Sequence, residues 1–240
     1  MPKPMTISAT ILTNDDGIDA PGIAALRAAV DGAPVLTVAP AEHQSGCGHT
    51  VTTDGIRIER RGEWAWAIHG TPADCVRVAL LHILPELGIT APRERLRVLS
   101  GINEGGNLGA DLYISGTAAA AREAAFFSVP AIALSNYRGD RGIDWPRAVR
   151  WTRTVLAELA THAHVPGRYW NINFPSLAPD APEPSLVFCP RSTDPLPVKY
   201  RHDAGVLSYI HETYHQRARR PGTDVDICFS GQISATAVEL

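Results

Sequence analysis

Apolar runs and helical patterns alternate along the first three quarters of the chain. Residues 7–13 are β-prone, and Pro21 opens a helical pattern that places Ile23, Leu26 and Val30 on one face. The same patterns predict further buried strands at 35–39, 97–102, 130–135 and 170–174, and further helices at 72–84, 117–127 and 145–162. Strands that alternate with helices at this spacing indicate βαβ units, so we expect an α/β fold with a mostly parallel sheet flanked by helices.

Three segments depart from this alternation. Residues 50–59 and 64–69 alternate between apolar and polar positions, which predicts antiparallel strands. Residues 41–50 are polar and Gly-rich, too long a stretch for a tight turn. After Pro175 proline becomes frequent and helical periodicity ends, while 206–210 is typical of one arm of a hairpin whose other arm is left open. We therefore expect an α/β catalytic core over 1–175 and a β-rich C-terminal extension over 176–240.

Composition narrows the class of protein. The 240 residues are 45% hydrophobic and 20% charged, which describes an ordinary globular chain rather than a disordered or fibrous one. There are 22 Lys and Arg against 25 Asp and Glu, a formal charge of −3, and the basic residues form no stripe, so nucleic-acid polymers are disfavoured as partners. No segment resembles a signal peptide or membrane span, which predicts a cytoplasmic protein without a membrane partner. The four cysteines are scattered, so we expect reduced, mostly buried thiols.

The candidate chemistry follows the predicted strands, because ligands of open parallel sheets bind outside the carboxyl ends of the strands. Residues 14–17, Asn-Asp-Asp-Gly, follow the first strand and supply carboxylate oxygens of the kind that Mg²⁺ or Mn²⁺ prefers. Taken alone, this tetrapeptide is better explained by a polar turn with an N-cap Asp. Residues 45–50, Ser-Gly-Cys-Gly-His-Thr, could line a pocket in the long loop, although His49 alone is more typical of a surface residue.

Two further clusters strengthen the metal-and-phosphate interpretation. Residues 100–111 combine Asn103 and Asn107 with four glycines, so that the backbone can approach a ligand while the amides bind a metal or phosphate. Residues 115–117, Ser-Gly-Thr, open an Ala-rich helix whose free N–H groups and dipole favour an anion. Taken alone, residues 115–117 are better explained by a plain Ser/Thr cap, but the four clusters together predict metal-assisted phosphate chemistry.

A rival motif occurs at residues 211–215, which read His-Glu-Thr-Tyr-His and match the H-E-x-x-H zinc-peptidase signature. That chemistry requires a helix that brings both imidazoles to one face. The preceding residues alternate as a strand and Pro221 follows soon afterwards, so a zinc peptidase is the weaker alternative.

The ordered motifs resemble the SurE (survival protein E) family of metal-dependent nucleotidases. They are Thr13–Gly17 with Ala20–Ile23, Val38–Pro40 with Ser45 and Gly46, Gly70–Cys75, Ser100–Asn103 through Asn107–Gly109, Ser115–Thr117 and Asn171–Asn173, with a fainter match at Gly222–Asp224, Gly231, Ser234 and Thr236. The resemblance is clear over residues 7 to about 175. It implies a Rossmann-like core, a β-rich hairpin extension used in oligomerisation, and a homodimer or homotetramer.

The resemblance also implies an activity and a set of site residues. The activity is hydrolysis of nucleoside 5′- and 3′-monophosphates to nucleoside and phosphate, with one Mg²⁺ or Mn²⁺ per subunit. The metal ligands carried over are Asp15, Asp16, Ser45 and Asn103, and the substrate and phosphate residues are Asn14, His49, Asn107, Ser115, Gly116 and Thr117. We expect Asp15, Asp16 and Asn103 to be catalytic, with Asp15 orienting or deprotonating the water that attacks phosphorus.

Some positions depart from the family's pattern. Gln44 stands before Ser45 where the family usually has Arg, Gly106 replaces a usual Pro, and Ala125 replaces a usual Gly. The lost positive charge at Gln44 motivates a rival hypothesis, the same phosphatase redirected to another phosphorylated metabolite. A catalytically silent nucleotide-binding protein is the third hypothesis, and retention of all four metal-ligand positions argues against it.

Overall fold

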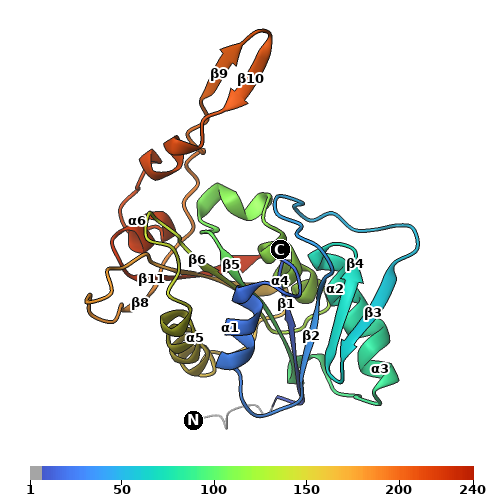
Figure 1. Ribbon diagram of the computed structural model, residues 1–240. Helices are drawn as coiled ribbons and strands as arrows, with labels where there is room; N and C mark the ends of the chain where they lie inside the picture. Colours follow the sequence, from blue (N-terminus) through green and yellow to red (C-terminus); the bar gives the residue numbers. More distant parts are fainter. Residues whose placement is uncertain (1–6) are drawn as a thin grey trace.

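A nine-stranded sheet forms the centre of the computed structural model, which describes residues 7–240 without the side chains of 211–213 (Figure 1). Its strands are β1 (Ala9–Thr13), β2 (Val35–Pro40), β3 (Arg57–Gly62), β4 (Ala65–His69), β5 (Leu96–Glu104), β6 (Ala131–Asn136), β7 (Arg168–Phe174), β8 (Leu186–Phe188) and β11 (Ile233–Glu239). They lie in the order β3-β4-β2-β1-β5-β6-β7-β11-β8.

The sheet is mostly parallel, as predicted. Strands β4, β2, β1, β5, β6 and β7 all run in one direction, whereas β3 is antiparallel to β4 and β11 is antiparallel to β7. The chain moves outward from β1 through β2 in one direction and returns to place β5 on the other side of β1. This reversal creates a switch point between β1 and β5, where ligands of doubly wound sheets characteristically bind.

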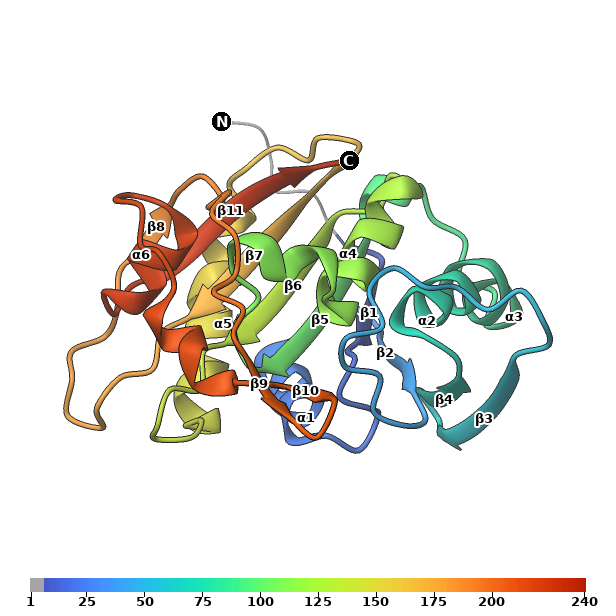
Figure 2. The ribbon, with the colours of Figure 1, turned by 90° about the horizontal axis from the view of Figure 1, so that it is seen from above.

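Helices cover both faces of the sheet (Figure 2). They are α1 (Pro21–Ala29), α2 (Pro72–Val78), α3 (Leu84–Glu86), α4 (Gly116–Phe126), α5 (Trp145–Leu159) and α6 (Asp224–Phe229). Successive β1 residues point to opposite faces, so Ile11 packs with α2 and α4 while Leu12 packs with α1 and α5. The prediction of an α/β fold with flanking helices is confirmed.

The helix predicted from Pro72 continues beyond α2. A capping box starts it: the Thr71 side chain accepts from the Asp74 backbone N–H at 3.2 Å, and the Asp74 carboxylate accepts from the Thr71 N–H at 2.9 Å. A π-helical turn at Ala79–Ile83 then joins α2 to α3. Pro85 lacks the N–H that an uninterrupted α-helix would need there, which accounts for the irregular turn.

The predicted strand at 50–59 is only half correct. Residues 50–56 form no strand, and β3 starts at Arg57 on the edge of the sheet. Thr52 instead donates its N–H and hydroxyl to the buried Asp74 carboxylate, at 3.0 and 2.7 Å, so this segment is held at the start of α2. Alternation in the sequence does not reveal this competing partner.

The C-terminal region has two parts. Strands β8 and β11 complete the central sheet, and α6, which periodicity did not predict, packs near β11. The remaining strands, β9 (Tyr200–Asp203) and β10 (Val206–Tyr209), form the antiparallel hairpin whose second arm the sequence predicted. Figure 1 shows this hairpin projecting away from the rest of the molecule.

The four cysteines differ in their burial. All four cysteines are free thiols, with Cys75 and Cys228 buried and Cys47 and Cys189 partly exposed. Among the helices of residues 7–240, none has the length and apolar character needed to cross a membrane.

Candidate active site

The turn after β1 presents two adjacent carboxylates at the switch point. Asn14 is fully buried, and its side chain closes the turn by donating to the Gly17 carbonyl at 2.8 Å and accepting from the Gly17 N–H at 3.2 Å. Gly17 has a φ of +103°, a conformation that side-chain-bearing residues rarely adopt. Asn14 therefore shapes the turn, and Asp15 and Asp16 are the residues that the turn displays.

Asp15 lies against the start of α4. Its carboxylate is 3% exposed and accepts a hydrogen bond from the Thr117 hydroxyl at 2.5 Å. A Cβ at Gly116 would lie 2.7 Å from the Asp15 Cβ, so only glycine permits this approach. Burial raises the pKa of Asp15 despite the stabilising bond from Thr117. The predicted anion site and the first carboxylate are thus in contact.

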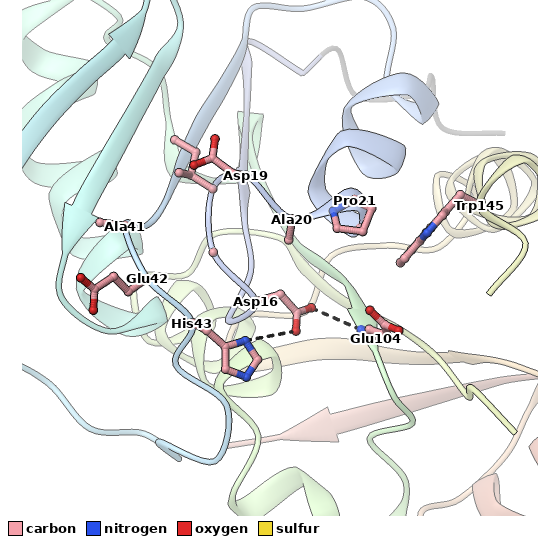
Figure 3. Close-up of a pocket in the computed structure, with 12 residues that line it drawn as sticks. Asp16, Asp19, Ala20, Pro21, Ala41, Glu42, His43, Glu104 and Trp145 are labelled. Carbon is pink, nitrogen blue, oxygen red and sulfur yellow. Dashed lines mark hydrogen bonds and ion pairs between the residues drawn. The ribbon is translucent and has the colours of Figure 1, made fainter. Parts of the chain in front are cut away.

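Asp16 lies between His43 and Glu104 (Figure 3). Its carboxylate accepts from the Glu104 backbone N–H at 3.3 Å and lies 3.7 Å from His43 Nδ1. Burial, and secondly repulsion from Asp15, raises the pKa of Asp16 to about 6. Two neighbouring carboxylates consequently share one site with little compensating positive charge.

The long loop at 41–50 is attached to this site at two points. The Gln44 N–H donates to the Asp15 carbonyl at 2.7 Å, and the Gly48 N–H donates to the Ile114 carbonyl at 3.0 Å. Ser45 follows the first attachment and is exposed. The loop thereby brings Ser45 to the same edge of the sheet as the carboxylates.

Ser115 and the two asparagines have different environments. Ser115 caps α4, because its hydroxyl accepts from the Ala118 N–H at 3.0 Å. Asn103, near the end of β5, donates its side-chain amide to the Gly105 carbonyl at 2.8 Å, which leaves its Oδ1 as the atom able to bind a cation. The side-chain amide of Asn107 donates to the Ser135 hydroxyl at 2.8 Å, while the backbone carbonyl of Asn107 accepts from the side chains of Asn171 and Asn173 at 2.9 and 3.0 Å.

These contacts join Asn107 to the ends of β6 and β7, so the residue holds the glycine-rich loop against the sheet. Its role in phosphate binding stays a prediction, because one of the two N–H donors of its side chain is bonded to Ser135.

His49 is held by the side of α4 rather than by the turn. Its Nε2 lies 2.8 Å from Glu123, a buried carboxylate that also accepts from Arg77 at 2.7 Å. Burial raises the pKa of Glu123, but the bonds from His49 and Arg77 outweigh it and leave the pKa below its usual value. Glu123 is seven residues beyond Gly116, or about 10 Å along the helix axis. The predicted nearness of His49 to substrate remains untested.

A divalent cation fits the donors at the turn. The raised pKa values of Asp15 and Asp16 reflect buried negative charge that a cation would neutralise. Across the described side chains, no group of three or more His, Cys, Asp and Glu is placed to hold a metal ion. The shell would therefore need neutral oxygens, and Asn103 and Ser45 are the predicted donors.

A second set of contacts, missed by the sequence reasoning, holds the glycine-rich loop. The buried Arg217 donates to the Asp111 carboxylate at 2.7 Å and to the Leu108 carbonyl at 2.9 Å. Asp224, also buried, accepts from the Gly109 N–H at 2.7 Å. The partners are more than 100 residues apart in sequence, so no local pattern could have revealed them; the faint match at 222–224 was the available signal.

The H-E-x-x-H segment has the wrong geometry for a zinc helix. Residues 211–216 form a 3₁₀ helix, in which side chains three apart align and those four apart do not. His215 Nδ1 is hydrogen-bonded to the Tyr137 hydroxyl. The side chain of His211 lies outside the described residues.

Comparison with known proteins decides the family. A profile described as "Survival protein SurE" matches residues 10–192. The chain belongs to the SurE family. The predicted resemblance is therefore confirmed, and it includes the turn, the long loop and the start of α4.

Individual SurE relatives match along nearly the whole chain. A Nostoc protein named "Putative 5′-nucleotidase alr3139" is 50% identical over 96% of this chain and 99% of its own. A 5′-nucleotidase SurE from Rhodopirellula baltica is 38% identical over 90% of this chain and 86% of its own. The crystal structure of the Aquifex aeolicus SurE protein superposes with a TM-score of 0.83 at 29% identity, covering 96% of this chain and 93% of that one.

Proposed function

We infer that this SurE-family chain is a phosphoric monoester hydrolase that releases phosphate from nucleoside 5′-monophosphates. Its curated relatives are named as 5′-nucleotidases, and the similarity extends over most of both chains. The observation that carries the proposal is the contact of the Asp15–Asp16 turn with the start of α4, where a cation site meets an anion site. Action on 3′-monophosphates is a further prediction.

The start of α4 is suited to hold the phosphoryl group. Its first backbone N–H groups and the positive end of its dipole favour phosphate oxygens, and their charge increases during in-line displacement. Ser115 fixes the first turn through its cap, while Gly116 lets the helix approach Asp15. The helix start thus supplies hydrogen-bond donors to phosphate.

Asp15, Asp16, Asn103 and Ser45 are the proposed ligands of one Mg²⁺ or Mn²⁺ per subunit. When bound, this cation would offset phosphate charge and acidify a water. Asp15 would orient that water: its Oδ1 accepts the bond from Thr117, and its other oxygen lies beside Gly116. Asp16 contributes charge from the other side of the turn.

A substrate panel tests the proposed function. Release of phosphate would be measured from nucleoside 5′- and 3′-monophosphates and from sugar phosphates, with Mg²⁺ or Mn²⁺. We expect the highest kcat/KM for a nucleoside 5′-monophosphate. Fast turnover of another ester beside slow turnover of every nucleotide would support the redirected phosphatase that Gln44 motivated. No turnover despite nucleotide binding would support the silent binding protein.

We also propose that the β9–β10 hairpin joins subunits into a homodimer or homotetramer. Tyr200, Val206 and Leu207 are each more than half exposed on this projecting arm, although apolar surface of this kind is stabilised by burial. Leu207→Glu should shift the mass measured by light scattering toward the monomer, whereas Ser208→Glu serves as the matched charge control. An unchanged mass for Leu207→Glu would contradict the proposal.

A further inference from the structure

A cavity of about 380 Å³ opens on the Asp16 side of the turn (Figure 3). Its walls are the turn into α1, residues 16–22, the start of the long loop, residues 41–43, and the side chains of Glu104 and Trp145. The volume falls within the roughly 300–1,000 Å³ typical of small-molecule pockets. We call it the Trp145 pocket.

The pocket is next to Asp16, whereas the proposed phosphate site is next to Asp15. Asp16 lines the pocket, whereas Asp15 contacts Gly116 and Thr117, neither of which lines it. A phosphate at the start of α4 would therefore leave the pocket free. A group attached to that phosphate could extend past Asp16 into it.

The charges of the pocket disfavour a second phosphate. Besides Asp16, a proposed metal ligand, Asp19, Glu42 and Glu104 contribute three carboxylates, and His43 is the titratable base among the lining residues. Carboxylates repel anions but accept hydrogen bonds from hydroxyl and amino groups. The preferred occupant is thus a neutral group rich in donors.

Pro21 and Trp145 contribute the apolar rings of the wall. Pro21 and Trp145 lie on the same side of the pocket, near Glu104 (Figure 3). A Cβ at Gly22 would meet the Ile102 carbonyl oxygen at 2.0 Å and the Trp145 ring at 3.3 Å, so α1 is packed tightly onto β5 and this ring. An indole ring in the wall offers a planar aromatic ligand an apolar contact.

We propose that the Trp145 pocket binds the nucleoside part of a nucleoside monophosphate, with the base against Trp145 and donor groups facing the carboxylates. This inference rests on the proposed function, because it assigns the leaving group of that reaction. It makes Trp145 a specificity-determining residue and predicts poor binding of leaving groups that carry further phosphates.

The test compares ligands that fill different parts of the site. Assays with β-glycerol phosphate, a small ester without a ring, would measure inhibition by a free nucleoside and, separately, by inorganic phosphate. The test variant is Trp145→Leu, and Trp145→Phe keeps an aromatic ring at the same position. The control is Trp64→Leu, which removes an exposed tryptophan at the opposite end of the sheet, where the parallel strands begin.

We expect Trp145→Leu to raise the inhibition constant of the nucleoside about 10-fold, as loss of a base-stacking face does elsewhere. Inhibition by phosphate and turnover of β-glycerol phosphate should stay within about two-fold. Trp145→Phe and Trp64→Leu should behave like the unchanged protein. Equal loss for all ligands, or an unchanged nucleoside constant, would overturn the assignment.

Glu104→Gln covers the case in which Trp145→Leu fails to fold. Its backbone N–H still supports Asp16, and loss of the carboxylate should raise kcat/KM for a nucleoside diphosphate relative to the monophosphate several-fold. An unchanged ratio would count against the pocket. If the protein hydrolyses β-glycerol phosphate but no nucleotide, the proposed function fails, while nucleoside inhibition still tests the pocket separately.

Discussion

The two sides of the Asn14–Gly17 turn give adjacent, chemically identical carboxylates different surroundings. Asp15 is packed under the start of α4, bonded to the Thr117 hydroxyl and in contact with Gly116. Asp16 faces an open pocket with an exposed histidine nearby. The Asp15 side is fixed by close packing and is suited to hold phosphate, whereas the Asp16 side has room for a leaving group.

Replacing either carboxylate is the largest expected perturbation. Asp15→Asn and Asp16→Asn should each lower kcat/KM by more than the roughly 10- to 100-fold that loss of an outer-shell partner costs. Neither should lower the melting temperature, because each removes a buried charge whose pKa is raised. Added Mn²⁺ should raise the melting temperature of the unchanged protein but not of the variants. Near-normal turnover with metal bound would remove the replaced residue from the mechanism.

Gly116→Ala should have the next largest effect. The new Cβ would overlap Asp15, and a displacement of about 1 Å at a reacting group costs roughly 100-fold in rate. Gly55→Ala is the control, because a Cβ there would meet no atom within 4 Å. If steady-state kinetics show both variants equally active, the close contact between α4 and Asp15 is not needed.

Thr117→Val removes the hydroxyl that fixes Asp15 while keeping the shape of the side chain. We expect kcat to fall about 10-fold, the scale of an outer-shell partner. Thr117→Ser, which keeps the hydroxyl, should remain within a few-fold of the unchanged enzyme. Equal activity of the Val and Ser variants would show that the bond does not orient Asp15.

His43→Ala is expected to have the smallest effect. The His43 side chain is 63% exposed and 3.7 Å from Asp16, and such surface pairs contribute about 0–1 kcal/mol. The variant should therefore keep kcat within about five-fold, the factor that corresponds to 1 kcal/mol. A loss as large as that of Thr117→Val would mean that the Asp16 side is as tightly organised as the Asp15 side.

The sequence predicted the parts of the molecule that depend on local patterns. Apolar periodicity predicted β1 and α1. Because residues 14–17 and 115–117 follow predicted strands of a parallel sheet, the sequence also predicted that they lie at one edge of it. Helix α6 was missed because it is short and follows a proline-rich region. The alternation of apolar and polar residues at 50–56 also could not reveal the Thr52–Asp74 contact that forms there in place of a strand.

The remaining site features depend on contacts between distant segments. Arg217 reaches Asp111 across 106 residues, and Glu123 reaches His49 across 74. The spacing of residues in the chain carries no signal for such pairs, because burial and partner choice arise only when the fold is complete. The Trp145 pocket is likewise formed by four separate segments.

Phosphate release after metal removal tests most directly whether the protein is a metal-dependent phosphatase. The protein would be treated with EDTA and assayed on a nucleoside 5′-monophosphate before and after Mg²⁺ or Mn²⁺ is restored, with Asp16→Asn alongside. Our account predicts that release stops with EDTA, returns with the metal, and does not return in the variant. Undiminished release in EDTA, or full metal-dependent release by Asp16→Asn, would contradict it.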